Sequence, residues 1–477
     1  MIAASKLQDR PAPALPAIPL RSDVWGALGD WLLRHQRAIR KTQWGVVAAY
    51  LLLLIVPAAL PLPHRLAHIW TDVTLFAQFV FWGLWWPFVL LSTVLVGRAW
   101  CGLLCPEGAL SEFASRHGLG HAIPRWITWP GWPFTAFAAT TVYGQLVSVY
   151  QYPAPALLIL GGSTLAAVAV GAAFGRRKRV WCRYLCPVSG VFGVLAKLAP
   201  LHFRVDADAW HASQQLPKAR PTRIDCAPLV PIRTMRGASQ CHMCGRCSGF
   251  RGAVQLARRS PNHEIVEVSA ETANAGESVF IIVGMIGIAA GAFQWSQSPW
   301  TVSMKQSLAG WLVGQGMVWP LETTAPWWLL TNYPANNDVL TLLDGAVLVA
   351  YVFMTAAILS AVISLSLACA TLAAGRWSWP RFHHLTQSLI PVAGCSIFLE
   401  LSSLSVTLLC AEGFQLGWVS TARMALLVGA SLWTLALARA IARRYTDSRL
   451  RRMAAVVAVS AAVAAVNIGP VLLFWLW

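Results

Sequence analysis

Long apolar stretches separated by short polar loops dominate this chain. Most of them have the roughly 18 to 25 residues with which an α-helix crosses about 30 Å of hydrocarbon. They run over residues 43–60, 74–97, 131–150, 155–174, 278–295, 339–372, 385–410, 418–438 and 453–476. The sixth stretch exceeds a straight crossing and predicts a tilted or extended helix. The pattern therefore predicts an all-α polytopic membrane protein with about nine spans.

The charged residues lie mainly in the polar loops. Only 12% of the residues are charged, whereas 57% are hydrophobic. The 37 basic residues exceed the 19 acidic ones, and they gather in alternate loops, at residues 34–41, 98–125, 176–183, 376–381 and 439–452. By the positive-inside rule this predicts a bacterial inner membrane protein with a cytoplasmic N-terminus and a periplasmic C-terminus. Topology accounts for the basic excess, so we expect no nucleic acid partner.

Four regions follow from these patterns. Residues 1–42 form a cytoplasmic tail that ends in an interfacial helix with Trp25 and Trp31, and no cleavable signal peptide is expected. Residues 43–199 form a duplicated helix-hairpin membrane module. Residues 200–277 are the long polar segment, and residues 278–477 form a C-terminal membrane module of about five spans.

Two matched cysteine motifs end the two hairpins of the duplicated module. Residues 100–106 (WCGLLCP) and 181–187 (WCRYLCP) both follow the pattern W-C-x3-C-P. Cysteines four residues apart share one helix face, so each copy offers two sulfurs in one direction. Duplicated hairpins tend to pack about a pseudo-twofold axis, which predicts that the two pairs face each other. The four cysteines are Cys101, Cys105, Cys182 and Cys186.

A third motif lies in the polar segment, where Cys241, Cys244 and Cys247 follow the spacing C-x2-C-x2-C. This spacing supplies three of the four ligands of a [4Fe-4S] cluster. A zinc ribbon would need a second C-x2-C pair, which the segment lacks. The usual C-P continuation is also missing, so the fourth ligand is Cys226 or, alternatively, Cys186.

With Cys226 in the polar segment, the eight cysteines divide into two sets of four and predict two clusters. For the set in the paired motifs, the alternatives are a soft-metal thiolate site such as Cu(I) and a dithiol redox pair. Thiolate ligands need a reducing compartment, in agreement with a cytoplasmic face. The basic residues of 176–183 would stabilise thiolates and an anionic cluster, and could dock an acidic electron carrier.

Glu400 is the one carboxylate near the middle of an apolar stretch. A carboxylate at that depth is costly and usually faces a polar interior or a proton path. The functional interpretation is a proton relay. The structural interpretation is a hydrogen bond that locks its helix to a neighbour or to Ser402 or Ser403.

The paired C-x3-C-P motifs, beginning Gly97-Arg98-Ala99-Trp100-Cys101 and Trp181-Cys182 and followed by a cluster segment, resemble the membrane iron–sulfur proteins of the NapH, NosR and CcoG type. The resemblance covers roughly residues 43–260. It implies quinol oxidation and electron delivery in nitrate or nitrous-oxide respiration for the first two types, and copper reduction during oxidase assembly for the third. This chain departs from them in having one C-x2-C-x2-C motif and extra spans after residue 277.

The sequence thus predicts inner-membrane electron transfer through two [4Fe-4S] clusters, as a component of a quinol-oxidising or metal-reducing oxidoreductase. The expected partners are membrane lipid, a quinone or soluble electron carrier, and a partner redox protein or respiratory complex. The alternatives are a copper-reducing or copper-handling assembly factor that uses the C-x3-C-P thiolates, and a redox-controlled transporter.

Overall fold

The computed structural model describes residues 23–64, 66–215, 224 and 226–477, so the first part of the predicted tail lies outside the described residues. Within them, eight helices or continuous helix runs are long and apolar enough to cross a membrane, and they confirm the all-α polytopic prediction. They are α2 (Gln36–Ala59), α3 to α4 (Val73–Val96), α8 to α9 (Pro153–Phe174), α14 to α15 (Ala275–Gln294), α18 (Leu342–Ala373), α19 to α20 (Trp379–Ala411), α21 (Trp418–Arg443) and α22 with its continuation (Arg449–Leu476).

The third predicted stretch, residues 131–150, is not among these eight. Its helix, α7 (Trp132–Leu146), has 15 residues, which at about 1.5 Å of rise per residue fall short of the hydrocarbon thickness. The helix ends because the chain turns at Ser148, where φ is +52°. Even so, α7 connects the two ends of the molecule. Trp132 packs near Val180 beside the second cysteine motif, and the carbonyl of Leu146 accepts the N–H of Thr331 at the opposite end.

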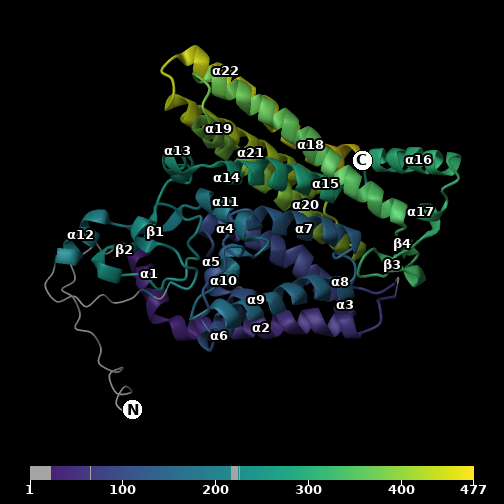
Figure 1. Ribbon diagram of the computed structural model, residues 1–477, viewed down its shortest axis with the longest axis horizontal. Coiled ribbons are helices and arrows are strands. Elements are labelled where there is room, and N and C mark those ends of the chain that lie inside the picture. The colour runs from purple at the N-terminus through teal and green to yellow at the C-terminus, as the bar shows by residue number, and fades with distance from the viewer. Residues whose placement is uncertain (1–22, 65, 216–223, 225) are drawn as a thin grey trace, which may run out of the picture.

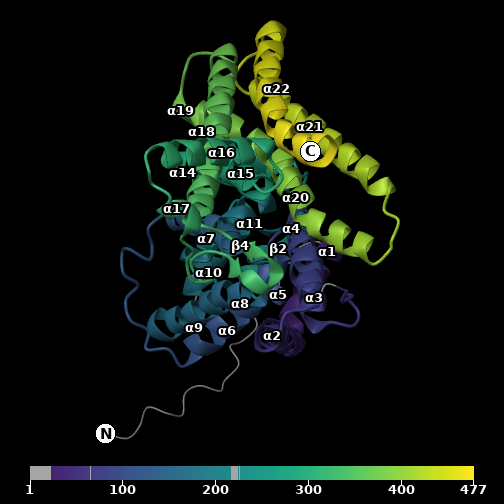
Figure 2. The same ribbon diagram turned by 90° about the vertical axis from the view of Figure 1, so that its right-hand side faces the viewer.

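The helices form two groups, which Figures 1 and 2 show on opposite sides of the molecule. One group contains α2, α9 and the short α6 (Pro106–Arg116), and the other contains α18, α21 and α22. A large apolar core includes side chains of the second group and draws on both halves of the chain, with residues such as Leu195 and Leu389. At the cysteine end, the buried ammonium group of Lys197 donates to Glu277 at 2.7 Å and to Gln387 at 2.9 Å.

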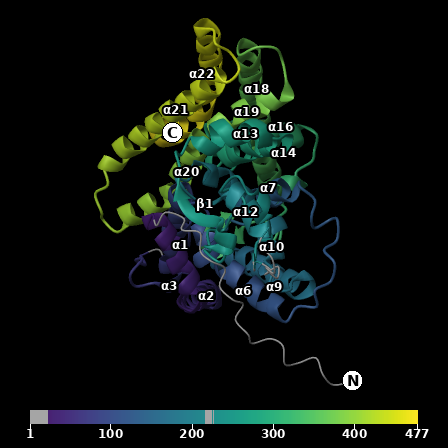
Figure 3. The same cartoon turned by 90° about the vertical axis from the view of Figure 1, so that its left-hand side faces the viewer.

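The polar segment folds around an antiparallel strand pair, β1 (Leu201–Val205) and β2 (Val254–Arg258), in the register Leu201↔Arg258 to Val205↔Val254. Figure 3 views the molecule from this end, where α12 (Ala207–Gln215) lies beside β1. Phe203, Trp210 and Leu256 form a small core to which Cys241, Cys226 and Cys247 also belong. The segment therefore buries its cysteines in its own apolar centre.

The predicted interfacial helix, α1 (Val24–Arg34), packs on this segment. A Cβ at Gly29 would lie 3.1 Å from Leu256 of β2, and Trp25 joins the core of the segment. Trp31 remains exposed. One face of α1 is thus used for protein packing, and its position relative to the headgroups stays a prediction.

The end remote from the cysteines holds α16 (Pro299–Gly314), α17 (Trp319–Glu322) and the short strands β3 (Asn332–Tyr333) and β4 (Asp338–Val339). The C-terminal Trp477 lies at this end, in an edge-to-face contact with Trp300. The cysteine motifs and the C-terminus are therefore at opposite ends of the helix bundle.

Candidate functional site: two cysteine sets beside an aromatic cavity

The two C-x3-C-P copies adopt the same local structure. Each begins with a five-residue helix, α5 (Ala99–Leu103) or α10 (Val180–Tyr184). In the first copy the N–H of Cys105 donates to the carbonyl of Trp100 at 2.9 Å, and in the second the N–H of Cys186 donates to that of Trp181 at 3.0 Å. The two copies of the predicted duplication therefore share the same backbone hydrogen bond.

Proline and glycine fix the ends of the first copy. Gly97 has φ +69°, a left-handed conformation that favours glycine and that separates α4 (Trp86–Val96) from α5. Pro106 occupies the first turn of α6, where its missing N–H costs nothing. Cys105 caps this helix, and its sulfur accepts the N–H of Gly108 at 3.4 Å. The cysteine that precedes the proline is thereby held at a helix N-terminus, which favours a thiolate.

The four cysteines of the two copies lie close enough to affect one another's ionisation. Burial and the nearby thiolate of Cys101, opposed by the charge of Arg179, together raise the pKa of Cys182 to about 12. Burial and neighbouring thiolates of the same four also raise the pKa of Cys105 and of Cys186 well above the ordinary value. The predicted juxtaposition of the two pairs is thus what the structure contains.

The side chains also connect the two copies. The indole N–H of Trp181, in the second copy, donates to the carboxylate of Glu107, just after the first, at 3.2 Å. Burial raises the pKa of Glu107, which lines the same apolar space as the four cysteines. Glu107 was not singled out by the sequence analysis.

The cysteine segment forms the second set. Burial, together with the neighbouring Cys244 and Cys226, raises the pKa of Cys241 to about 12. Cys247 is affected by burial and then by Cys241, Cys244 and Cys226, so its pKa is also raised. Met243 and Gly245 have positive φ values, +52° and +76°, which curl the loop between the cysteines. The structure therefore places Cys226 beside the C-x2-C-x2-C motif, while its role as a ligand stays a prediction.

The two sets touch through backbone atoms. A Cβ at Gly102, inside the first C-x3-C-P motif, would lie 1.9 Å from the carbonyl oxygen of His242 and 3.0 Å from the amide nitrogen of Cys244. Only a residue without a side chain permits this contact. Electrons that reach either set would therefore have a short path to the other.

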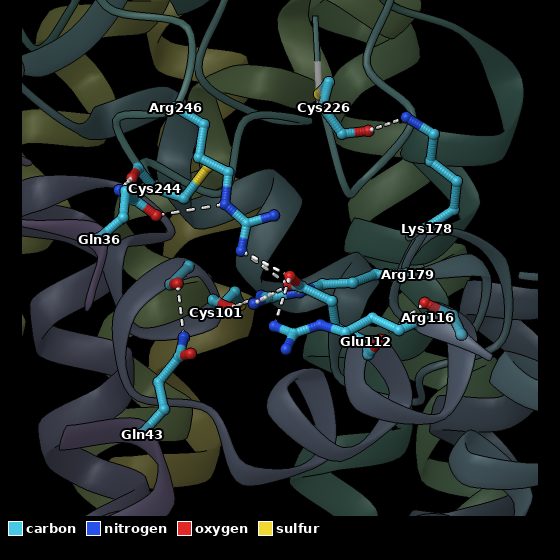
Figure 4. A network of polar contacts seen from close by, with 12 residues as sticks. Gln36, Gln43, Cys101, Glu112, Arg116, Lys178, Arg179, Cys226, Cys244 and Arg246 are labelled. Carbon is cyan, nitrogen blue, oxygen red and sulfur yellow. Dashed lines mark hydrogen bonds and ion pairs between the residues drawn. The ribbon is translucent and has the colours of Figure 1, made fainter. Parts of the chain in front are cut away.

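A buried ion network holds the two sets together (Figure 4). The carboxylate of Glu112 on α6 accepts the Arg179 guanidinium at 2.9 Å and that of Arg246 at 2.7 Å. Arg179 also donates to the carbonyl of Cys101 at 2.6 Å. In the sequence, Arg246 lies between Cys244 and Cys247 of the segment. Although burial opposes ionisation, the two guanidinium charges hold the pKa of Glu112 below its ordinary value. Arg179 was predicted only as one of several basic residues, and Glu112 and Arg246 were missed.

An apolar cavity of about 230 Å³ extends from the first cysteine set into the helix bundle. Aromatic side chains such as Trp82, Trp86 and Phe293 form much of its wall. The first set contributes all four of its cysteines, and His242 contributes from the segment. Sequence spacing could not reveal this cavity, because its wall combines residues from many separate parts of the chain, between Tyr50 and Leu401.

Glu400 lies in α20 (Ile390–Ala411), 3% exposed, next to this cavity. Ile397, about one helical turn before Glu400, and Leu401, directly after it, line the cavity. One carboxylate oxygen lies 3.5 Å from the side-chain amide of Gln294, and the other has no hydrogen-bond partner among the described residues. Ser402 and Ser403 instead donate to backbone carbonyls of their own helix.

Both donor sets consist of cysteines, which are the ligands of [4Fe-4S] clusters. Each cysteine of a cubane cluster binds a different iron, whereas one tetrahedral ion gathers its sulfurs at about 2.3 Å from a single centre. Across the part of the chain that the structure describes, no group of three or more His, Cys, Asp or Glu side chains is arranged to hold one metal ion. Four buried thiols with mutually raised pKa values would release protons on binding metal.

Comparison with known proteins supports this arrangement. Residues 78–143 and 157–205 match a 4Fe-4S binding domain family, and these ranges include both C-x3-C-P motifs. A protein of Escherichia coli (strain K12), named "Putative electron transport protein YccM", is 28% identical over 185 residues, which cover 34% of this chain and 50% of that protein. The chain thus matches about half the length of this relative. No solved structure matches. The predicted resemblance to membrane iron–sulfur electron-transfer proteins is confirmed.

Proposed function

We propose that this protein transfers electrons in the membrane through two [4Fe-4S] clusters. Cys101, Cys105, Cys182 and Cys186 would hold the first, and Cys226, Cys241, Cys244 and Cys247 the second. Each cluster supplies a site that accepts and releases one electron. The family match supports the first site, and the C-x2-C-x2-C spacing with the adjacent Cys226 supports the second.

The observation that carries the proposal is the continuous arrangement from the cavity to the segment. The cavity reaches all four cysteines of the first set, and the first set touches the second at Gly102. We propose a membrane quinol as the donor, because an apolar, aromatic cavity inside the helix bundle suits a flat hydrophobic ring. The segment then faces the acceptor, which is a soluble carrier or a partner redox protein.

Glu400 is the proposed proton relay. Oxidation of one quinol breaks two O–H bonds and releases two electrons and two protons, and the protons need an acceptor near the cavity. The unpartnered oxygen of Glu400 is such an acceptor, because its flanking residues form part of the cavity wall. Gln294 orients the carboxylate from the neighbouring helix.

Replacement of Glu400 by glutamine tests this role. Glutamine keeps the size and the hydrogen bond to Gln294 but cannot take up a proton, so a quinol analogue should reduce the clusters several-fold more slowly. Stopped-flow absorbance of anaerobic protein measures this rate. Cluster content and the rate of reduction by dithionite should stay unchanged and serve as the control. Unaltered quinol kinetics in an intact Glu400→Gln protein would remove this residue from the mechanism.

The assignment of Cys226 makes a separate prediction. Cys226→Ser should alter the same paramagnetic signal as Cys244→Ser and leave the signal that depends on Cys101, because Cys226 lies with the segment cysteines. Electron paramagnetic resonance of reduced membranes distinguishes the two signals. If Cys186→Ser alters the segment signal and Cys226→Ser does not, the division into two sets is wrong.

Copper handling by the C-x3-C-P thiolates remains the alternative function, since soft metals also bind buried thiolates. It requires one copper ion shared by at least two of these cysteines. A redox-controlled transporter is the third alternative and would use the helices after residue 277. Metal analysis separates copper handling from electron transfer.

We also propose that the cysteine end faces the bacterial cytoplasm. Arg98, Arg176 and the arginines between α21 and α22 lie at this end, as the positive-inside rule requires. A phosphatase reporter fused after Trp477 should then be active, because the C-terminus would lie in the periplasm. An inactive fusion in a stable protein would mean that the C-terminus lies in the cytoplasm, which contradicts the proposed orientation.

A further inference from the structure

Arg98 is a buried cation at the junction of the two cysteine sets. Its side chain is 6% exposed, and one terminal nitrogen donates to the carbonyl of Ser239 in the segment at 3.0 Å. Its Nε has no hydrogen-bond partner, and the guanidinium lines the cavity together with the first cysteine set. Among the described residues, no carboxylate pairs with Arg98.

Arg98 lies beside both sets. Its side chain lines the cavity together with Cys101 and Cys182 of the first set. The carbonyl of Ser239, to which it donates, lies two residues before Cys241 of the second set. The other buried arginine at this junction, Arg179, donates to the carboxylate of Glu112, which it shares with Arg246.

We propose that Arg98 is a positioning residue that raises the reduction potentials of both clusters together. This inference rests on the proposed two-cluster function. Reduction adds one negative charge to a cluster, and a nearby buried cation stabilises that charge because screening by water is weak there. One residue that acts on both clusters would keep the difference between their reduction potentials small.

Potentiometric titration of the purified full-length protein, followed by electron paramagnetic resonance, tests the proposal. In Arg98→Gln, the ratio of reduced to oxidised cluster at a fixed potential should fall about tenfold for both clusters, equivalent to about 59 mV for a one-electron couple. Arg98→Lys should restore most of this ratio, because it keeps the charge. Arg204→Gln, which removes an exposed arginine of β1, is the matched control and should change neither potential.

A shift of one potential only, no shift, or equal shifts in the Gln and Lys variants would overturn the proposal. If Arg98→Gln loses its clusters, a second pair of variants decides. A Cβ at Gly193 would lie 4.0 Å from the guanidinium of Arg98, so Gly193→Asp should neutralise the cation and lower both potentials relative to Gly193→Asn. Equal reduction potentials in Gly193→Asp and Gly193→Asn would also overturn the proposal. Absence of clusters from the unaltered protein would instead refute the proposed function.

Discussion

Replacement of Gly102 by alanine is expected to detach the cysteine segment from the first C-x3-C-P motif. The new Cβ would lie 1.9 Å from the carbonyl oxygen of His242, and the obstructing atom is backbone that cannot rotate away. Overpacking of a close contact costs about 1 to 3 kcal/mol, and a backbone obstacle places this site at the upper end or beyond. Iron content should fall by about half, with loss of the signal that depends on Cys244.

Gly45→Ala is the matched control for this change, because a Cβ at Gly45 in α2 would meet no atom within 4 Å. It should keep full iron content and both paramagnetic signals. Normal iron content in Gly102→Ala would mean that the two sets are not in contact in the assembled protein.

Replacement of Glu112 by glutamine should destabilise the same junction. The variant removes the carboxylate that the buried guanidinium of Arg179 shares with that of Arg246. Removal of one partner from a buried ion pair costs about 3 to 5 kcal/mol. The midpoint of chemical denaturation should therefore fall substantially. Glu271→Gln is the control, because Glu271 and its partner Arg236 are both exposed and such pairs contribute little.

This carboxylate also predicts a dependence on pH. Because the pKa of Glu112 is lower in the folded protein than its ordinary value of 4.5, its stabilising effect is complete above that value. The effect is lost as the pH falls through the folded pKa. Acid should therefore destabilise the unaltered protein more steeply than Glu112→Gln below pH 4.5. Parallel acid denaturation curves would contradict this role of Glu112.

The parts of this account that could be predicted from the sequence are those with a fixed spacing. Eight of the nine predicted apolar stretches are helices long enough to cross a membrane, and the four-residue cysteine spacing in two copies predicted that Cys101 and Cys182 would lie together. The third stretch forms a shorter helix than its length suggests, because hydropathy does not indicate where a helix stops. Ser148 reverses the chain there and hydrogen bonds to Thr331 near the far end of α7.

Contacts between distant parts of the chain could not be predicted in this way. Glu112 follows Cys105 by seven residues in an ordinary amphipathic helix, and nothing in that pattern indicates two guanidinium partners from residues 179 and 246. Gly102 has a helical conformation, so no turn pattern marks it. Its significance comes only from the backbone of His242 packed against it. That Arg179 pairs with a carboxylate, and that Arg98 pairs with none among the described residues, is likewise visible only in three dimensions.

The most direct test of the central claim is the metal and sulfide content of anaerobically purified full-length protein. Two [4Fe-4S] clusters require about eight iron and about eight acid-labile sulfide per chain, with no copper. About four iron together with bound copper would contradict the two-cluster account and assign the C-x3-C-P cysteines to copper.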